Sequence, residues 1–268
     1  IPWCLAAIVF WFLFKRYPLP RLVEATRHAN LLFLISFSVV YFLYIWVVDC
    51  WGIARTLSRF GIPTGTSELL QVRAASYLIT IVNYGVGQGT LAFFLNRKKN
   101  IPFLKISSVI LLITAIDLYW VISFALIGSC FAKPNIAGIS LQYPIRILWI
   151  VSTLCLILLS VLAHVDLGRI ALGPMALGKR LQRFQSWSFF HILHEGHVRH
   201  YIATLLERLP MHVAINASLY FVAWTFHSHI PFGVIISSIP IVILIGAIPI
   251  TPGGLGTTQI ATVSLLKD

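Results

Sequence analysis

The feature that most constrains this chain is a run of prolines and glycines inside its longest uncharged stretch. No Asp, Glu, Lys or Arg occurs between Arg208 and Lys267, and a membrane-spanning helix would fill such a stretch with apolar residues. Residues 249–259 instead read PITPGGLGTTQ. Because proline disrupts a helix and glycine permits left-handed backbone, we expect a broken helix at membrane depth. An ordinary loop between two helices at the membrane surface is the alternative.

Non-helical backbone at membrane depth is tolerated only where protein or a water-filled cavity surrounds it. Half-helix ends in such places hold the substrates of many transporters. The candidate binding residues in this break are Pro252, Gly253, Gly254, Gly256, Thr257, Thr258 and Gln259.

An earlier stretch repeats this pattern. Residues 85–92 (GVGQGTLA) align with residues 254–261 (GLGTTQIA), and both lie in apolar sequence. Interrupted segments in corresponding positions of two halves are typical of transporters built from inverted repeats. We therefore expect a second broken or re-entrant segment, non-helical over residues 85–89 and close to the first. Its candidate binding residues are Asn83, Gly85, Gly87 and Gln88.

Composition indicates an integral membrane protein. Hydrophobic residues make up 58% of the chain and charged residues only 10%, where a soluble domain has about 25% charged residues. The net charge of +12 is distributed mainly between apolar segments, which indicates topology signals and contact with anionic lipid rather than nucleic-acid binding. The four cysteines are scattered and form no metal or redox pair, and we expect no metal and no cofactor.

Segment lengths predict an all-α, polytopic helical domain covering residues 1–268, and the sequence leaves open whether both natural ends are missing. Residues 49–68 are expected to form a polar connection, and residues 166–208 an amphipathic connection with surface helices. The predicted apolar segments, about seven in number, are 1–14, 31–48, 74–96, 106–131, 147–163, 209–226 and 231–248.

The positive-inside rule places two basic stretches, residues 97–105 and 166–208, on the cytoplasmic side. The basic loop at residues 15–27 is cytoplasmic if residues 74–96 cross the membrane. It is external if that segment enters the membrane and returns to the same side.

Asp117 is the acidic residue inside a predicted span. A carboxylate in lipid costs about 2.5–3.5 kcal/mol on insertion scales, which makes it a functional candidate. The alternative is a paired or neutral Asp that holds helices together. Four histidines recur every third residue from His191 to His200, but the spacing of His194 and His197 does not fit a zincin motif, and a solvated interfacial face is the simpler interpretation.

Residues 237–259, with their Pro-Gly-Gly-x-Gly motif, resemble the signature of a membrane family. That family is the flippase-like transmembrane region of lysylphosphatidylglycerol synthase and its stand-alone relatives. Residues 25–30, residues 83–88 and the basic residues 97–99 before the span with Asp117 follow the family's order. The resemblance implies a polytopic domain of the bacterial inner membrane that handles or translocates lipid, without the soluble aminoacyl-transferase domain.

The chain departs from the pattern of the family it resembles. Gln88 and Gln259 stand where the family commonly has acidic residues, Leu91 stands where it usually has arginine, and Leu118 follows Asp117 where arginine is often found. Uncharged amides can still hydrogen-bond a phosphate, sugar or hydroxyl.

Three functions remain open from the sequence. The first is translocation of a membrane lipid or lipid-linked carrier, with membrane lipids as the partners. The second is an accessory subunit of a larger membrane complex, in which the glycines allow close helix packing. The third and weakest is a lipid-modifying enzyme, since no acid–base pair converges in the sequence.

Overall fold

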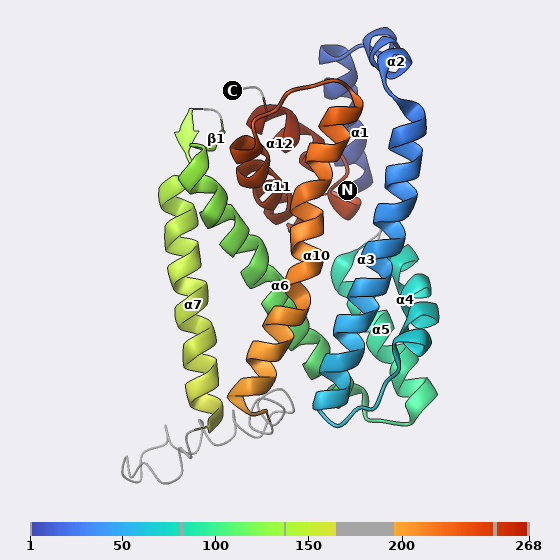
Figure 1. Ribbon diagram of the computed structural model, residues 1–268, viewed down its shortest axis with the longest axis vertical. Coiled ribbons are helices and arrows are strands. Elements are labelled where there is room, and N and C mark those ends of the chain that lie inside the picture. Colours follow the sequence, from blue (N-terminus) through green and yellow to red (C-terminus); the bar gives the residue numbers. More distant parts are fainter. Residues whose placement is uncertain (1, 81–82, 137, 165–195, 249–250, 267–268) are drawn as a thin grey trace.

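The computed structural model describes residues 2–80, 83–136, 138–164, 196–248 and 251–266. In these residues the chain is almost entirely α-helical, with one short hairpin of two strands, so the all-α prediction is confirmed (Figure 1). The elements are α1 Pro2–Arg16, α2 Leu19–His28, α3 Leu31–Arg59, α4 Thr66–Thr80, α5 Tyr84–Lys99, α6 Phe103–Phe131, β1 Asn135–Ile136, β2 Ile139–Ser140, α7 Gln142–His164, α10 Val198–Thr225, α11 Phe232–Ala247, η1 Pro252–Gly254 and α12 Thr257–Leu265.

Two of the described helices, α3 and α6, are long and apolar enough to cross a membrane. Each has 29 residues, and a rise of about 1.5 Å per residue makes such a helix longer than the hydrocarbon core is thick. Both helices can therefore span the apolar layer and still extend into the polar region. Seven separate spans are not established.

Helices α3 and α10 run antiparallel along the bundle. At the upper end in Figure 1, the backbone N–H of Asn30 donates to the carbonyl of Thr225 over 3.1 Å. At the lower end, which carries the loops 60–65 and 100–102, Arg59 forms an ion pair with Glu207. The two helices thus stay together over nearly their whole length.

Helices α4 and α5 form a hairpin that starts and finishes at the lower end (Figure 1). At its base, Lys99 Nζ lies 2.7 Å from Glu68 Oε2 and donates to the carbonyl of Pro63 over 2.7 Å. The predicted apolar segment at residues 74–96 therefore contains the end of α4 and most of α5. This arrangement agrees with the alternative in which the segment returns to the side it came from, not with a single crossing. Glycine explains the tight tip: a Cβ on Gly87 would lie 2.8 Å from Thr80 Cα.

This hairpin settles the position of the basic loop at residues 15–27. Because the hairpin returns to the end it started from, α3 and α6 connect opposite ends of the bundle, and residues 15–27 lie at the other end from residues 97–105 (Figure 1). The side of the membrane stays a prediction: if residues 97–105 are cytoplasmic, as the positive-inside rule predicts, the loop is external.

Helices α11 and α12 form a second hairpin, which starts and finishes at the upper end (Figure 1). Gly233, near the start of α11, packs against Phe131 at the end of α6. Leu265, at the end of α12, belongs to an apolar cluster that Ile136 of β1 packs against. Between the helices, Gly253, Gly254 and Gly256 have φ values of 56°, 71° and 88°. The predicted helix break at residues 253–256 is confirmed.

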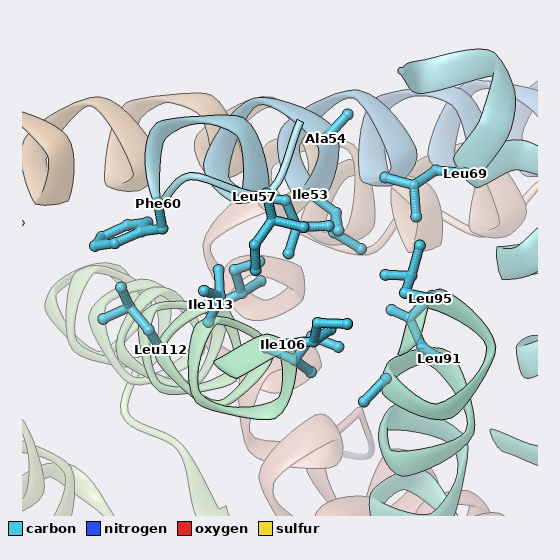
Figure 2. Close-up of a cluster of buried hydrophobic side chains, with 14 of the residues drawn as sticks. Ile53, Ala54, Leu57, Phe60, Leu69, Leu91, Leu95, Ile106, Leu112 and Ile113 are labelled. Carbon is cyan, nitrogen blue, oxygen red and sulfur yellow. The ribbon is translucent and has the colours of Figure 1, made fainter. Parts of the chain in front are cut away.

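The largest apolar core joins the first hairpin to α3 and α6. Figure 2 shows Ile53 and Leu57 of α3, Leu91 of α5 and Ile106 of α6 meeting in this core. All four side chains are buried. The core fixes the position of the first hairpin within the bundle, and so determines where the polar residues of α4 lie.

Two predicted connections are partly wrong. The polar connection at residues 49–68 begins with the last 11 residues of α3, where Asp49 is buried. The amphipathic connection at residues 166–208 has its last part in α10, where Arg208 is buried. Its expected surface helices lie mostly in residues 165–195, outside the described residues. The prediction ends each connection at the charged residue that borders an apolar run. Asp49 and Arg208 nevertheless lie inside helices, because each has a charged partner within the bundle.

Helices α6 and α11 cross at very short range because Gly128 of α6 faces the backbone of Ser237 in α11. We expect Gly128→Ala to destabilise the protein by about 1–3 kcal/mol, since the added methyl group forces the helices apart. Gly89→Ala is the matched control, because nothing lies within 4 Å of a Cβ built at Gly89. The measurement is thermal unfolding in detergent. Equal melting temperatures for the two variants would contradict the close crossing.

Candidate functional site

A buried network of charges lies where α3, α4, α6 and α10 meet. Its centre is Arg208 of α10, which joins two carboxylates from different helices. Arg208 Nη1 donates to Asp49 Oδ1 over 2.8 Å. Its Nε and Nη2 donate to the two oxygens of Asp117 over 2.7 and 2.8 Å. One guanidinium therefore links α3, α6 and α10.

A second guanidinium extends the network to the first hairpin. Arg73 Nε donates to Asp49 Oδ2 over 2.7 Å, and the Tyr77 hydroxyl donates to the same oxygen over 2.7 Å. Arg73 Nη1 also donates to Gln88 Oε1 over 3.2 Å. The network therefore reaches from the middle of the bundle to the first turns of α5.

Three of the four charges are almost completely removed from solvent, whereas the side chain of Asp117 is 15% exposed. The exposed fractions are 1% for Asp49, 2% for Arg208 and 5% for Arg73. An unpaired charge at such a site costs several kcal/mol, and burial is tolerated only with good geometry and further hydrogen bonds. The two arginines and the carboxylates of Asp49 and Asp117 give the network a formal charge of zero.

The local sequence makes room for this arrangement. A Cβ on Gly52 would lie 3.3 Å from Cδ of Arg208, so the absence of a side chain one turn after Asp49 lets the arginine lie flat against α3. Arg208 and His212 are four residues apart on α10 and so lie on one face of that helix. His212 Nε2 lies 3.1 Å from Asp117 Oδ1.

The family comparison agrees with this membrane architecture. The model of the lysylphosphatidylglycerol synthase transmembrane region matches residues 2–267. The chain belongs to this family. No curated protein and no solved structure matched the chain. With its apolar helices, the assignment makes the chain an integral membrane protein with a lipid-related role.

The structure brings two of the predicted site residues of this family member into the charge network. Asp117 is paired with Arg208, and Gln88 accepts a hydrogen bond from Arg73. The pairing of Asp117 is the alternative that the sequence left open. Leu118 replaces the neighbouring arginine that the family resemblance implies, and here Arg208 of α10 supplies the guanidinium instead.

The prediction that residues 85–89 are non-helical is wrong. Helix α5 begins at Tyr84, and the side chain of Asn83 accepts a hydrogen bond from the N–H of Val86. Asn83 therefore caps the helix, while Gly85 lies exposed in its first turn. A side-chain cap stabilises a helix start by about 1 kcal/mol, less than the roughly 3 kcal/mol that three glycines cost relative to alanine. The burial of Leu91 and Leu95 in the apolar core supplies the remaining stabilisation of α5.

The candidate residues of the second break turn back onto their own backbone. The hydroxyls of Thr257 and Thr258 donate to the Gly254 carbonyl over 3.0 and 2.9 Å. Gln259 Oε1 accepts from the Gly256 N–H over 2.6 Å. Pro252 and Gly253 form the short helical turn η1 with Gly254. No described contact joins this break to the charge network, and the expected proximity of the two breaks stays a prediction.

The sequence patterns do not identify five residues of the network: Asp49, Arg73, Tyr77, Arg208 and His212. Asp49 directly follows a long apolar run and Arg208 directly precedes one, so both were interpreted as the borders of loops. The available signal was the helical continuation of apolar residues beyond each charge. It could have placed the charges inside helices, but it could not have identified their partners.

The spaced histidines show no metal centre in the structure. His191 and His194 lie outside the described residues, while His197 and His200 form a ring pair at the start of α10. Among the described residues, no cluster of three or more His, Cys, Asp or Glu side chains is arranged to hold a metal ion.

We expect Arg208→Met to destabilise the protein by about 3–5 kcal/mol, because it leaves the buried carboxylate of Asp49 and the partly buried carboxylate of Asp117 without their shared partner. Adding Asp117→Asn should recover part of this loss by removing one of the two unpaired charges. The measurement is thermal unfolding in detergent, analysed as a double-mutant cycle.

The control for this prediction is Arg55→Met. Arg55 pairs with Glu207, but its side chain is 56% exposed, so its loss should cost no more than about 1 kcal/mol. Equal effects of Arg55→Met and Arg208→Met would show that the buried network does not stabilise the bundle.

Proposed function

We propose that the protein translocates membrane lipids or lipid-linked carriers across the bacterial inner membrane. The observation that carries this proposal is the pair of helical hairpins that enter the bundle from opposite ends and finish within its length (Figure 1). The backbone polar groups of a helix break inside an apolar bundle need protein or a water-filled cavity around them. A polar path for a lipid headgroup would provide such a cavity.

The two hairpins provide the elements that such a path requires. They have opposite orientations, as the two halves of an inverted repeat would have. Each second helix starts within the bundle, where the partial positive charge of a helix N-terminus favours an anionic group such as a lipid phosphate. The repeat and the shared path are parts of the proposal.

The charge network gives the first hairpin a means of responding to a headgroup. Arg73 holds Asp49 with one nitrogen and Gln88 with another. A phosphate that arrived near the start of α5 could replace Gln88 as the acceptor, and a guanidinium suits a phosphate because of its planar donor geometry. The uncharged Gln88 makes this exchange easier than an acidic residue would.

We expect Gly254→Leu to abolish lipid translocation. Gly254 has φ of 71°, and a Cβ there would lie 2.9 Å from Thr258 Cγ2 and 3.1 Å from Gly246 Cα. A leucine therefore strains the turn and separates α11 from α12. The assay uses purified protein in liposomes containing an acyl-labelled fluorescent lipid, whose transfer between leaflets is followed by quenching from outside.

Gly89→Ala serves as the control, and thermal unfolding shows whether Gly254→Leu remains folded. If folded Gly254→Leu moves lipid as fast as the unchanged protein, the broken turn is architectural. If the unchanged protein moves no lipid alone but copurifies with other membrane proteins, the accessory-subunit function replaces translocation.

Gln259→Ala should weaken translocation only modestly and leave the fold intact. The side chain is exposed and bonds to its own turn, and a neutral hydrogen bond contributes about 0.5–1.5 kcal/mol. The same liposome assay measures the rate. A complete loss of transport by a folded Gln259→Ala protein would instead make this amide a direct headgroup contact.

A further inference from the structure

The charge network contains two buried polar atoms that have no hydrogen-bond partner. Among the described residues, His212 Nδ1 and Asn216 Oδ1 are such atoms, and each residue is 3% exposed. They are four residues apart on α10, so they lie on the same face of the helix. Buried polar atoms in proteins nearly always have partners, and each exception requires an explanation.

The hydrogen bonds around His212 show whether the two unpartnered atoms are donors or acceptors. Asp117 can only accept, so the hydrogen of a neutral His212 lies on Nε2, which faces Asp117 Oδ1 at 3.1 Å. Nδ1 then carries a lone pair. Asn216 Nδ2 already donates to the backbone carbonyl of His212 over 2.8 Å, so its Oδ1 is an acceptor. The face thus presents two acceptors and no donor.

The ligand that these atoms can take is small. Both atoms are inaccessible to solvent, which leaves no space for a headgroup. A proton needs no cavity, and on Nδ1 it converts an unsatisfied acceptor into a donor. Joining this N–H to Asn216 Oδ1, one helical turn further along α10, requires a side-chain rotation, because the two atoms are not hydrogen-bonded in this structure.

We propose that His212 Nδ1 is a proton-binding site that couples protonation to binding of an anionic lipid headgroup. The coupling to headgroup binding rests on the proposed translocation function, whereas the proton site itself does not. Proton binding converts the imidazole to imidazolium and changes the formal charge of the network from zero to +1.

The charge change acts through Asp117. Its Oδ1 accepts from both Arg208 Nε and His212 Nε2, and the bond from His212 becomes charge-assisted once the ring is protonated. Arg208 then relies more on the carboxylate of Asp49 to neutralise its charge, and Arg73 pairs with the same carboxylate. The surplus positive charge is best balanced by an anion at Arg73, beside Gln88, and by linkage a bound anion favours the proton equally.

The elements packed around α10 contribute the groups that influence His212. Helix α11 contributes none, because residues 232–247 contain no ionisable side chain. The charged and titratable residues facing the network from α3, α4, α5, α6 and α10 are Asp49, Cys50, Arg73, Tyr77, Tyr84, Asp117 and Arg208. None of these residues is a histidine, the side chain whose unperturbed charge change falls between pH 5 and 8.

The test compares the unchanged protein with His212→Gln in liposomes of phosphatidylcholine containing acyl-labelled phosphatidylglycerol, at equal inside and outside pH between 5 and 8. We expect the transfer rate of the unchanged protein to change by about tenfold over this range, as a typical coupling between sites would produce. Glutamine can still donate to Asp117 but takes up no proton, so the His212→Gln rate should not vary with pH. The control is His229→Gln, an exposed histidine outside the helices, which should keep the normal profile.

A second measurement reads proton binding without lipid transport. The difference in melting temperature between the unchanged protein and His212→Gln should vary with pH, because proton binding at a folded site is linked to stability. If this difference varies with pH but no lipid moves at any pH, the proton site stands and the translocation function is wrong. If lipid moves at a rate independent of pH, or His212→Gln keeps the normal profile, the coupling is overturned.

Asn216→Leu keeps the inference testable if His212→Gln does not fold. It removes the acceptor that would stabilise the proton on Nδ1 while preserving the volume of the side chain. The pH profile of transport should therefore shift to lower pH. An unshifted profile in folded Asn216→Leu protein would show that Nδ1 is not the proton site.

Discussion

The ion pairs of Arg208 are the interaction on which the rest of this bundle depends. A guanidinium in an apolar interior is stable only if its charge and its five N–H donors are satisfied. Arg208 achieves this with carboxylates from two other helices, and Gly52 supplies the space. The requirement fixes both the rotation and the height of α3, α6 and α10 relative to one another. Apolar contacts alone would allow the helices to slide.

The first hairpin is held by two different kinds of interaction. Apolar residues of α4 and α5 pack into the core shared with α3 and α6. Arg73 then connects the hairpin to Asp49. A ligand that changed the partners of Arg73 would alter the polar attachment and leave the apolar one in place.

The second hairpin has a different design. Its tip is closed by hydrogen bonds within the turn from Thr257, Thr258 and Gln259. Close glycine contacts hold it against its neighbours, with Gly246 against Gly254 and Gly256 against Val9 of α1. The stability of this hairpin rests on backbone proximity rather than charge. The two hairpins enter the bundle from opposite ends, but different physical interactions hold each of them in place.

The sequence by itself determined the membrane class, the helical fold and the second break. The high apolar content shows that the helices are surrounded by lipid. Proline together with glycine in the left-handed region forces a turn at residues 252–256, whatever surrounds it. The sequence misplaced the first break, because whether these glycines lie in a turn or a helix depends on the cap that Asn83 provides and on the packing of α5 in the core. Only the tertiary structure decided which charges meet. Asp49, Arg73, Asp117 and Arg208 are far apart in the chain, and periodicity carries no information on pairing between helices. Inside the bundle each of these charges has a partner, since an unpaired charge there would cost a large part of the net stability of the fold.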